Sequence, residues 1–154
     1  MKRLENKTAI VTGGNSGIGK ATAILFAKEG ADLVLCARRK EALDKVAEEC
    51  RGYGVQVVTV KADVSSHEDC SAVVKAAVDT FGKVDILVNN AGILEEGLKP
   101  IDRFSDEDLD RIIETNEKGT MRCMRAASQK MQAGASIVNV ASIAGVKGCG
   151  GAAY

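Results

Sequence analysis

Residues 8–19 read Thr8-Ala9-Ile10-Val11-Thr12-Gly13-Gly14-Asn15-Ser16-Gly17-Ile18-Gly19, and this stretch decides the fold. Its first five residues have the apolar, β-branched pattern of a buried strand, and the pattern of a helix follows the glycines. Glycines let a backbone turn tightly and approach a pyrophosphate, while a helix N-terminus offers unpaired N–H groups and a positive dipole end. We therefore expect a dinucleotide phosphate site in this loop.

The spacing of these glycines is G-x-x-x-G-x-G. It differs from the commonest dinucleotide fingerprint, G-x-G-x-x-G, and no Gly-Lys-Ser or Gly-Lys-Thr closes it as in a P-loop. An ordinary strand-to-helix turn of an α/β protein is the alternative interpretation of so short a motif. Its place at the first strand–helix junction favours the phosphate site.

Short apolar runs alternate with longer amphipathic segments along the whole chain. The runs are continuously apolar, as in strands whose two faces are both covered by helices. This alternation predicts an α/β fold with a doubly wound parallel sheet of the Rossmann type, in one dinucleotide-binding domain over residues 1–154. The expected strands are 8–12, 33–36, 55–60, 86–88 and 136–141, and the expected helices are 18–29, 42–50, 67–81 after the cap Ser66, and 106–131 after the cap Ser105.

The composition argues against several classes of partner. Lys plus Arg and Asp plus Glu are 21 each in 154 residues, and this zero net charge argues against a nucleic-acid or acidic-membrane partner. No run approaches the roughly 18 apolar residues of a membrane span, and the charged start lacks the apolar core of a signal peptide. Five scattered cysteines without a C-x-x-C pair, and a single histidine, predict free thiols in a reducing cytoplasm and no metal site.

The end of the second strand, Cys36-Ala37-Arg38-Arg39, indicates which nicotinamide cofactor the chain takes. NAD-binding sheets usually place Asp or Glu there to bind the ribose 2′-hydroxyl. Here Ala37 stands in that place, and Arg38 and Arg39 follow it. Because a guanidinium binds a 2′-phosphate in a planar fork, these residues predict NADP. The alternative is a solvated helix start, since Lys40 continues the charged run.

Motifs at successive strand ends together resemble the short-chain dehydrogenase/reductase family, over the whole chain. The loop from Thr12 to Gly19 is similar to the cofactor loop of that family, and Asp63-Val64 is similar to its adenine-pocket pair. Asn89-Asn90-Ala91-Gly92 resembles the second signature of the family. The resemblance implies cofactor contacts from Gly13, Asn15, Ser16, Gly17, Ile18, Gly19, Asp63, Val64, Asn90, Ala91 and Gly92, and catalytic roles for Asn116, Ser142 and Tyr154.

This resemblance implies an oxidoreductase that transfers a hydride between NADP(H) and a carbonyl or alcohol substrate. Tyr154 would then be the acid/base, Ser142 would polarise the substrate oxygen, and Asn116 would support a water-linked proton path through its helix backbone. Because a free phenol has a pKa of about 10, family members lower it with a Lys four residues later and with the nicotinamide charge. Out of context, Ser142 is a turn residue and Tyr154 a packing aromatic. Asn116 is the local misfit, because Asn is unfavourable inside a helix.

Two departures from the family pattern bear on these expectations. The segment from Ser142 to Tyr154 is one residue shorter than the family spacing, a difference that the glycine-rich stretch 148–151 can absorb. The sequence ends at Tyr154, so the Lys and the C-terminal strands of the domain are missing from it, and strand five is expected to be an exposed edge. We expect this truncated chain to be inactive. The alternatives are a non-catalytic nucleotide-binding fragment or module, or epimerisation or dehydration on the same fold.

The sequence indicates less about the substrate and the oligomeric state than about the cofactor. Residues 94–104 form a mixed loop that indicates no substrate class, so steroids, sugars, acyl chains and small ketones all stay open as substrates. The resemblance implies a homo-oligomer at full length. Met121, Met124 and Ala126-Ala127 on the long helix fit either a stripe that faces a partner or one that faces the core.

Overall fold

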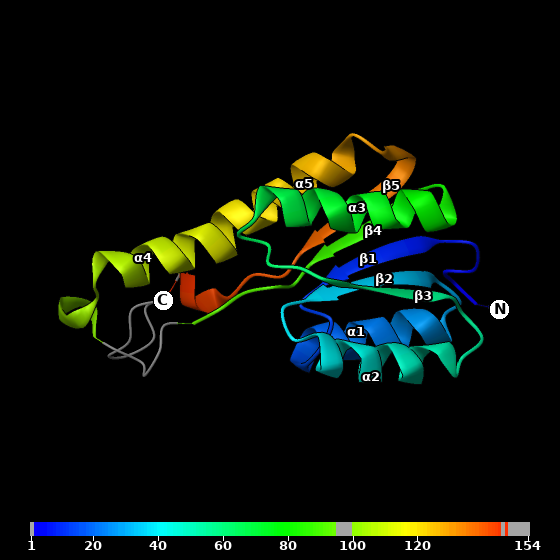
Figure 1. The fold of residues 1–154 in the computed structure, drawn as a ribbon, viewed down its shortest axis with the longest axis horizontal. Helices are drawn as coiled ribbons and strands as arrows, with labels where there is room; N and C mark the ends of the chain where they lie inside the picture. Colours follow the sequence, from blue (N-terminus) through cyan, green and yellow to red (C-terminus); the bar gives the residue numbers. More distant parts are fainter. Residues whose placement is uncertain (1, 95–99, 146, 148–154) are drawn as a thin grey trace.

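The computed structural model describes residues 2–94, 100–145 and 147. Its strands are β1 (Thr8–Thr12), β2 (Asp32–Ala37), β3 (Val57–Lys61), β4 (Val84–Asn89) and β5 (Met131–Asn139). They form one parallel sheet in the order β3-β2-β1-β4-β5 (Figure 1). The chain winds outward from β1 in both directions, as in a doubly wound Rossmann sheet, so the predicted fold class is confirmed.

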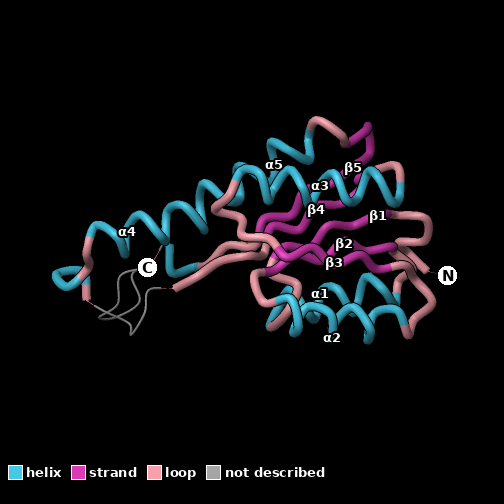
Figure 2. Tube along the Cα trace, in the orientation of Figure 1, coloured by secondary structure: helices cyan, strands magenta, loops and turns pink. Residues whose placement is uncertain are grey.

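Helices cover both faces of this sheet. In Figures 1 and 2, α1 (Gly17–Lys28) and α2 (Lys40–Arg51) lie on one face, and α3 (His67–Phe81) and α5 (Gly119–Ser128) lie on the other. Each face has its own buried core: Leu35 packs with Leu43 of α2 on one side, and Ile10 packs with Val74 of α3 on the other. Strands that are buried on both sides need apolar residues at every position, which explains the continuous apolar runs of the sequence.

Side-chain caps fix where two of the helices begin. The Ser66 hydroxyl accepts a hydrogen bond from the Asp69 N–H at 3.1 Å, at the start of α3. Ser105 and Asp108 form a reciprocal capping box at the start of α4 (Asp106–Ile112). Both caps stand where the sequence predicts them, because each hydroxyl satisfies an N–H that the first helical turn leaves unpaired.

The helix expected over residues 106–131 is in fact interrupted and shorter. After α4 the chain enters a π-helical turn, η2 (Ile113–Lys118), and continues as α5, which ends at Ser128. The prediction that this helix reaches Met131 is wrong, because Met131 pairs with Val84 of β4 and so belongs to β5. Ile86 then pairs with Ser136, and Gly134 lies in the irregular stretch between with a left-handed φ of 89°.

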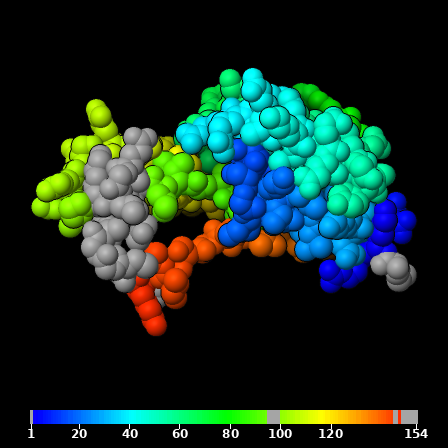
Figure 3. All heavy atoms as spheres, turned by 90° about the horizontal axis from the view of Figure 1, so that it is seen from below, coloured from blue at the N-terminus to red at the C-terminus, as the bar shows by residue number. Residues whose placement is uncertain are grey.

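β5 forms one edge of the sheet, and Figure 3 shows it along one side of the molecule (orange). Three apolar residues at its end are open to solvent: Ile137, Val138 and Val140 are 39%, 48% and 42% exposed. An exposed apolar edge at strand five, as expected from the sequence, is therefore present in the described part of the chain.

Candidate functional site

A cavity of about 340 Å³ lies at the carboxyl ends of β1 to β4. This size falls within the range of about 300–1,000 Å³ that small-molecule sites occupy, and open parallel sheets bind ligands at this edge, where the strand order reverses. The lining comes from the four loops after these strands and from η2: Gly13, Asn15, Ser16, Cys36, Ala37, Arg38, Arg39, Ala62, Asp63, Val64, Asn90, Ala91, Gly92, Ile93 and Thr115.

The glycine loop after β1 is shaped to bring backbone close to an anion. Gly13 and Gly17 have φ of 65° and 53°, which side chains rarely allow. A Cβ on Gly19 would overlap the carbonyl group of Gly13, so the loop packs directly on α1. Within the described structure the Ser16 side chain makes no capping bond, and the first turn of α1 has no acidic residue. The first N–H groups of α1 are thus available to a pyrophosphate, and the residues present fit one.

Thr12 ties the glycine loop to the loop after β4. Its hydroxyl oxygen accepts hydrogen bonds from the N–H groups of Asn90 and Ala91, at 3.0 and 2.9 Å. The Asn90 side chain donates in return to the carbonyls of Thr12 and Gly13, at 3.0 and 3.3 Å. Asn90 therefore holds two walls of the cavity together. The sequence reasoning missed this role of Thr12, although the residue stands at the head of the motif.

The two arginines after β2 differ in their surroundings. The guanidinium of Arg39 donates to the Asn15 side-chain oxygen, at 2.9 and 3.2 Å, when that amide is oriented to present its oxygen. Arg38 is exposed, lines the cavity and forms no ion pair with any described residue. Ala37 occupies the position where a carboxylate would bind a ribose hydroxyl. This rim of the cavity therefore carries positive charge and an unengaged guanidinium.

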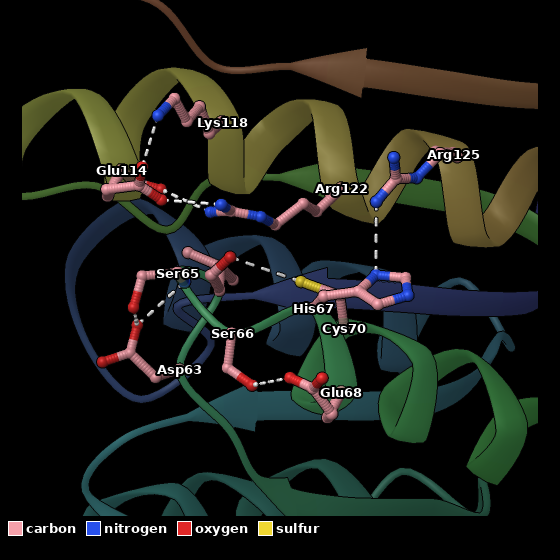
Figure 4. A network of polar contacts seen from close by, with 11 residues as sticks. Asp63, Ser65, Ser66, His67, Glu68, Cys70, Glu114, Lys118, Arg122 and Arg125 are labelled. Carbon is pink, nitrogen blue, oxygen red and sulfur yellow. Dashed lines mark hydrogen bonds and ion pairs between the residues drawn. The ribbon is translucent and has the colours of Figure 1, made fainter.

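Asp63 and Val64 form the wall of the cavity after β3. Figure 4 shows Asp63 beside Ser65 in this loop. The Asp63 carboxylate accepts from the N–H and the hydroxyl of Ser65, at 3.0 and 2.8 Å. The Asp63 N–H donates to the carboxylate of Asp69 at 2.8 Å. Val64 is 8% exposed and packs against Gly119 of α5. The wall is thus held rigidly, with one carboxylate oxygen of Asp63 engaged by its own loop.

Asn116 lies in η2 and holds the loop after β4 from the other side. Its side-chain oxygen accepts from the Ile93 N–H and its amide donates to the Ile93 carbonyl, both at 2.8 Å. Its own backbone carbonyl accepts the hydroxyl of Thr120 at 3.0 Å. Thr115, which is 8% exposed and lines the cavity, and Ile93 were not predicted as site residues. The strand–helix pattern of the sequence carries no signal for a π turn, which decides where these side chains point.

Ser142 and Asn116 form no hydrogen bond with each other among the described residues. Ser142 is exposed, and its hydroxyl accepts from the Ala144 N–H at 3.1 Å, which is the bonding of a turn residue. Tyr154 lies outside the described residues. Of the predicted cofactor residues, Gly17, Ile18 and Gly19 are not part of the cavity lining. The catalytic roles of Asn116, Ser142 and Tyr154 stay predictions.

Comparison with known proteins agrees with this geometry. Residues 7–154 match the family described as short chain dehydrogenase. The chain belongs to this family. Among its relatives, a 3-oxoacyl-[acyl-carrier-protein] reductase of Thermotoga maritima is 39% identical over 148 residues, which cover 95% of this chain and 59% of that protein.

Solved structures of the short chain dehydrogenase family give the same result. NAD+-bound xylitol dehydrogenase matches with a TM-score of 0.93 at 36% identity, covering 98% of this chain and 58% of that chain. A short chain dehydrogenase from Burkholderia cenocepacia in complex with NADP matches with a TM-score of 0.92 at 30% identity, covering 97% and 61%. This chain therefore spans about three fifths of the length of these relatives. Because both cofactors occur among them, membership of the family does not select one.

Two further findings concern residues 2–94, 100–145 and 147 of this short chain dehydrogenase. No three or more His, Cys, Asp or Glu side chains come together there in a group that could hold a metal ion. No helix in that part of the chain has both the length and the apolar stretch needed to cross a bilayer.

Proposed function

We propose that this chain is the nucleotide-binding part of an oxidoreductase that transfers a hydride between NADP(H) and a carbonyl or alcohol substrate. The observation that carries the choice of NADP is the charge at the end of β2. Ala37 leaves no carboxylate there to bind a 2′-hydroxyl, and Arg38 presents an unengaged guanidinium to the cavity among the described residues. A 2′-phosphate satisfies that group with charge-assisted hydrogen bonds.

In this proposal each part of the dinucleotide binds at a different wall of the cavity. The N-terminus of α1, with Gly13 and Ser16, is placed to bind the pyrophosphate. Asp63 and Val64 flank the adenine, with Arg38 and Arg39 on the adenosine 2′-phosphate. The remaining predicted contacts complete the phosphate loop and the nicotinamide half of the site: Asn15, Gly17, Ile18, Gly19, Asn90, Ala91 and Gly92.

A nicotinamide cofactor held in this cavity would supply or accept the hydride. The chain supplies the proton: the Tyr154 hydroxyl donates it to the carbonyl oxygen, or removes it from the alcohol in the reverse direction. Ser142 donates a hydrogen bond to the same oxygen and thereby stabilises the charge that develops on it. Asn116 acts as a positioning residue, because its side chain fixes Ile93 beside the cavity while its backbone serves the proton path.

The cofactor is tested by titrating the chain with NADPH and with NADH. We expect tighter binding of NADPH, and we expect Arg38→Asp to remove that preference. Hydrogen bonds to a charged group contribute about 1.5–3 kcal/mol, so NADPH affinity should fall by roughly 10- to 150-fold, with little change for NADH. Arg103→Asp is the matched control, because Arg103 is exposed and does not line the cavity. Equal affinities of the parent chain for the two cofactors would contradict the proposal.

The chemical step is tested in the active enzyme that contains this chain, by following the loss of NADPH absorbance with a panel of ketones and diketones. Removal of a general acid lowers rates by about 10²- to 10⁴-fold, and we expect a loss of this size for Tyr154→Phe. Tyr53→Phe is the control, because Tyr53 follows α2 and does not line the cavity. Full activity of Tyr154→Phe would remove Tyr154 as the acid, whatever the cofactor.

We further propose a cytoplasmic enzyme that assembles as a homo-oligomer. The described cysteines are free thiols, as in a reducing compartment. Leu109, Ile113 and Met121 are 40%, 41% and 58% exposed along α4, η2 and α5, and they supply apolar surface for a second copy. Met124 and Ala126 instead pack against the core of the α3–α5 face, with Ala127 buried inside it. Sedimentation of the enzyme as a single chain would contradict the assembly.

A further inference from the structure

Two cysteine side chains meet inside the core on the α3–α5 face of the sheet. The Sγ of Cys70, in the first turns of α3, lies 3.4 Å from the Sγ of Cys123 in α5. The two residues are 1% and 4% exposed. Cys70 also donates to the carbonyl oxygen of Val64 at 3.4 Å, a contact drawn as a dashed line in Figure 4. Cys70 and Cys123 are 53 residues apart in sequence, and their contact connects α3 to α5.

Close packing brings the two sulfurs to this separation. A Cβ on Gly119 would lie 2.8 Å from the Cγ2 of Val64, so the chain before α3 and the start of α5 approach as closely as a glycine allows. Cys123 follows Gly119 by about one helical turn, and Cys70 follows Val64 at the start of α3. Because Val64 and Gly119 are in direct contact, the thiol pair is part of the packed core.

The hydrogen bond between the thiols makes them chemically unequal. The S–H of Cys123 lowers the pKa of Cys70, although burial opposes this effect. The same hydrogen bond and burial raise the pKa of Cys123. Burial also raises the pKa of Cys36 to about 12 and that of Cys50 to about 11. Because the thiolate is the reactive form, this difference favours Cys70 over Cys123 as the nucleophile.

We propose that Cys70 and Cys123 form a peroxide-sensitive dithiol, which closes to a disulfide that links α3 to α5. The Cys70 thiolate attacks one oxygen of hydrogen peroxide, and the O–O bond breaks to give a sulfenic acid and a hydroxide, which is protonated to water. The Cys123 sulfur then attacks the sulfenic sulfur. An S–S bond forms, the S–O bond breaks, and a second water leaves with the Cys123 proton. The two thiols lose two electrons in total, and one peroxide becomes two waters.

The geometry permits both steps. Peroxide is close to water in size, and His67 and Glu68, which share the first turn of α3 with Cys70, are exposed. Helix ends open locally more readily than helix centres. The sulfurs must then move from 3.4 Å to the S–S length of about 2.0 Å. Oxidation also takes the Cys70 proton away from the Val64 carbonyl, at the wall of the nucleotide cavity.

The test is direct mapping of the disulfide in the unaltered chain. The reduced protein is treated with hydrogen peroxide, remaining thiols are blocked with N-ethylmaleimide, and the non-reduced digest is analysed by mass spectrometry. We expect one cross-linked peptide that contains Cys70 and Cys123, an intact-mass loss of about 2 Da before blocking, and reversal by dithiothreitol. A cross-link of Cys70 to Cys36, or reaction of other thiols without any Cys70–Cys123 peptide, would overturn the proposal.

Variants separate the two chemical steps. In Cys123→Ser the cross-link is lost, and a sulfenic acid at Cys70 is trapped by dimedone when the oxidised chain is unfolded in its presence, because no second thiol resolves it. Cys50→Ser is the matched control, since Cys50 is equally buried but lies in the core of the opposite face. It should form the same cross-link as the parent chain. Loss of the cross-link in Cys50→Ser, with circular dichroism unchanged, would show that the wrong pair had been assigned.

Discussion

Replacing Thr12 by valine tests how the ends of β1 and β4 are joined. Thr12 is 1% exposed, and its hydroxyl accepts from the N–H groups of Asn90 and Ala91 while it donates to the Val88 carbonyl at 3.4 Å. Valine has nearly the same shape but no acceptor. The substitution therefore leaves two backbone N–H groups without a partner and also removes the long hydrogen bond to the Val88 carbonyl.

The size of the effect follows from these contacts. A buried N–H that loses its partner costs about 1–3 kcal/mol. The two groups here are only partly buried, so we take the low end, about 2 kcal/mol for the pair. The extra buried methyl of valine recovers about 0.8 kcal/mol. We expect Thr12→Val to lower the free energy of unfolding by about 1–2 kcal/mol, a large part of the 5–15 kcal/mol typical of a domain.

Thr8→Val is the matched control for this assay. Thr8 lies at the other end of β1 and is 2% exposed, and its hydroxyl makes no hydrogen bond in the described part of the chain. Valine there gains the methyl and loses no acceptor. With a urea m-value of about 2 kcal/mol/M, the midpoints of the two variants should differ by about 1 M. Equal midpoints would refute the reasoning that Thr12 holds the two loops through its hydroxyl.

Two further predictions concern the glycine loop and the base of the sheet. Gly19→Ala places a Cβ against the Gly13 carbonyl and should weaken dinucleotide binding by more than tenfold in the same titration, whereas Gly14→Ala, whose Cβ makes only ordinary contacts at 3.4 Å, should not. Burial of Asp85 favours its neutral form, but hydrogen bonds from Lys83 and from the Thr8 N–H outweigh this and lower its pKa. A lowered pKa gives stability above the unfolded value of about 3.9 that is lost as the pH falls through the folded pKa. Asp85→Asn should therefore be less stable than the parent in urea at pH 7 and should lose less stability on acidification. An unchanged difference between pH 7 and pH 3.5 would count against this.

The fold was predictable because its signals are local. Each buried strand is a continuous apolar run, and the caps Ser66 and Ser105 mark helix starts with groups only three residues away. That residues from several loops share one cavity was predictable for a similar reason, since parallel strands bring all their carboxyl ends to one edge. Gly13, Ser16 and Arg38 therefore line one cavity although they come from different loops.

What the sequence could not predict depends on contacts between distant segments. The Thr12 hydroxyl meets Asn90 across 78 residues, and Asn116 meets Ile93 across 23. Neither of these two contacts produces a periodic pattern in the sequence. The helix end was misplaced for a similar reason: Met131 fits a helix by local preference, but its pairing with Val84 of β4 places it in a strand. Tertiary pairing overrides propensity at such positions.

The π turn from Ile113 to Lys118 determines how far the two ends of one long helix are rotated relative to each other about the helix axis. Each residue of an α-helix rotates the next by about 100°, and a π turn is equivalent to one inserted residue. Within this turn Thr115 lines the nucleotide cavity, and downstream of it Cys123 lies in the core. Deleting one residue within the turn would restore an unbroken α-helix and turn one end by about 100° relative to the other. Deletion of Glu117, which is exposed and lines neither the cavity nor the core, should therefore rotate Thr115 relative to Cys123.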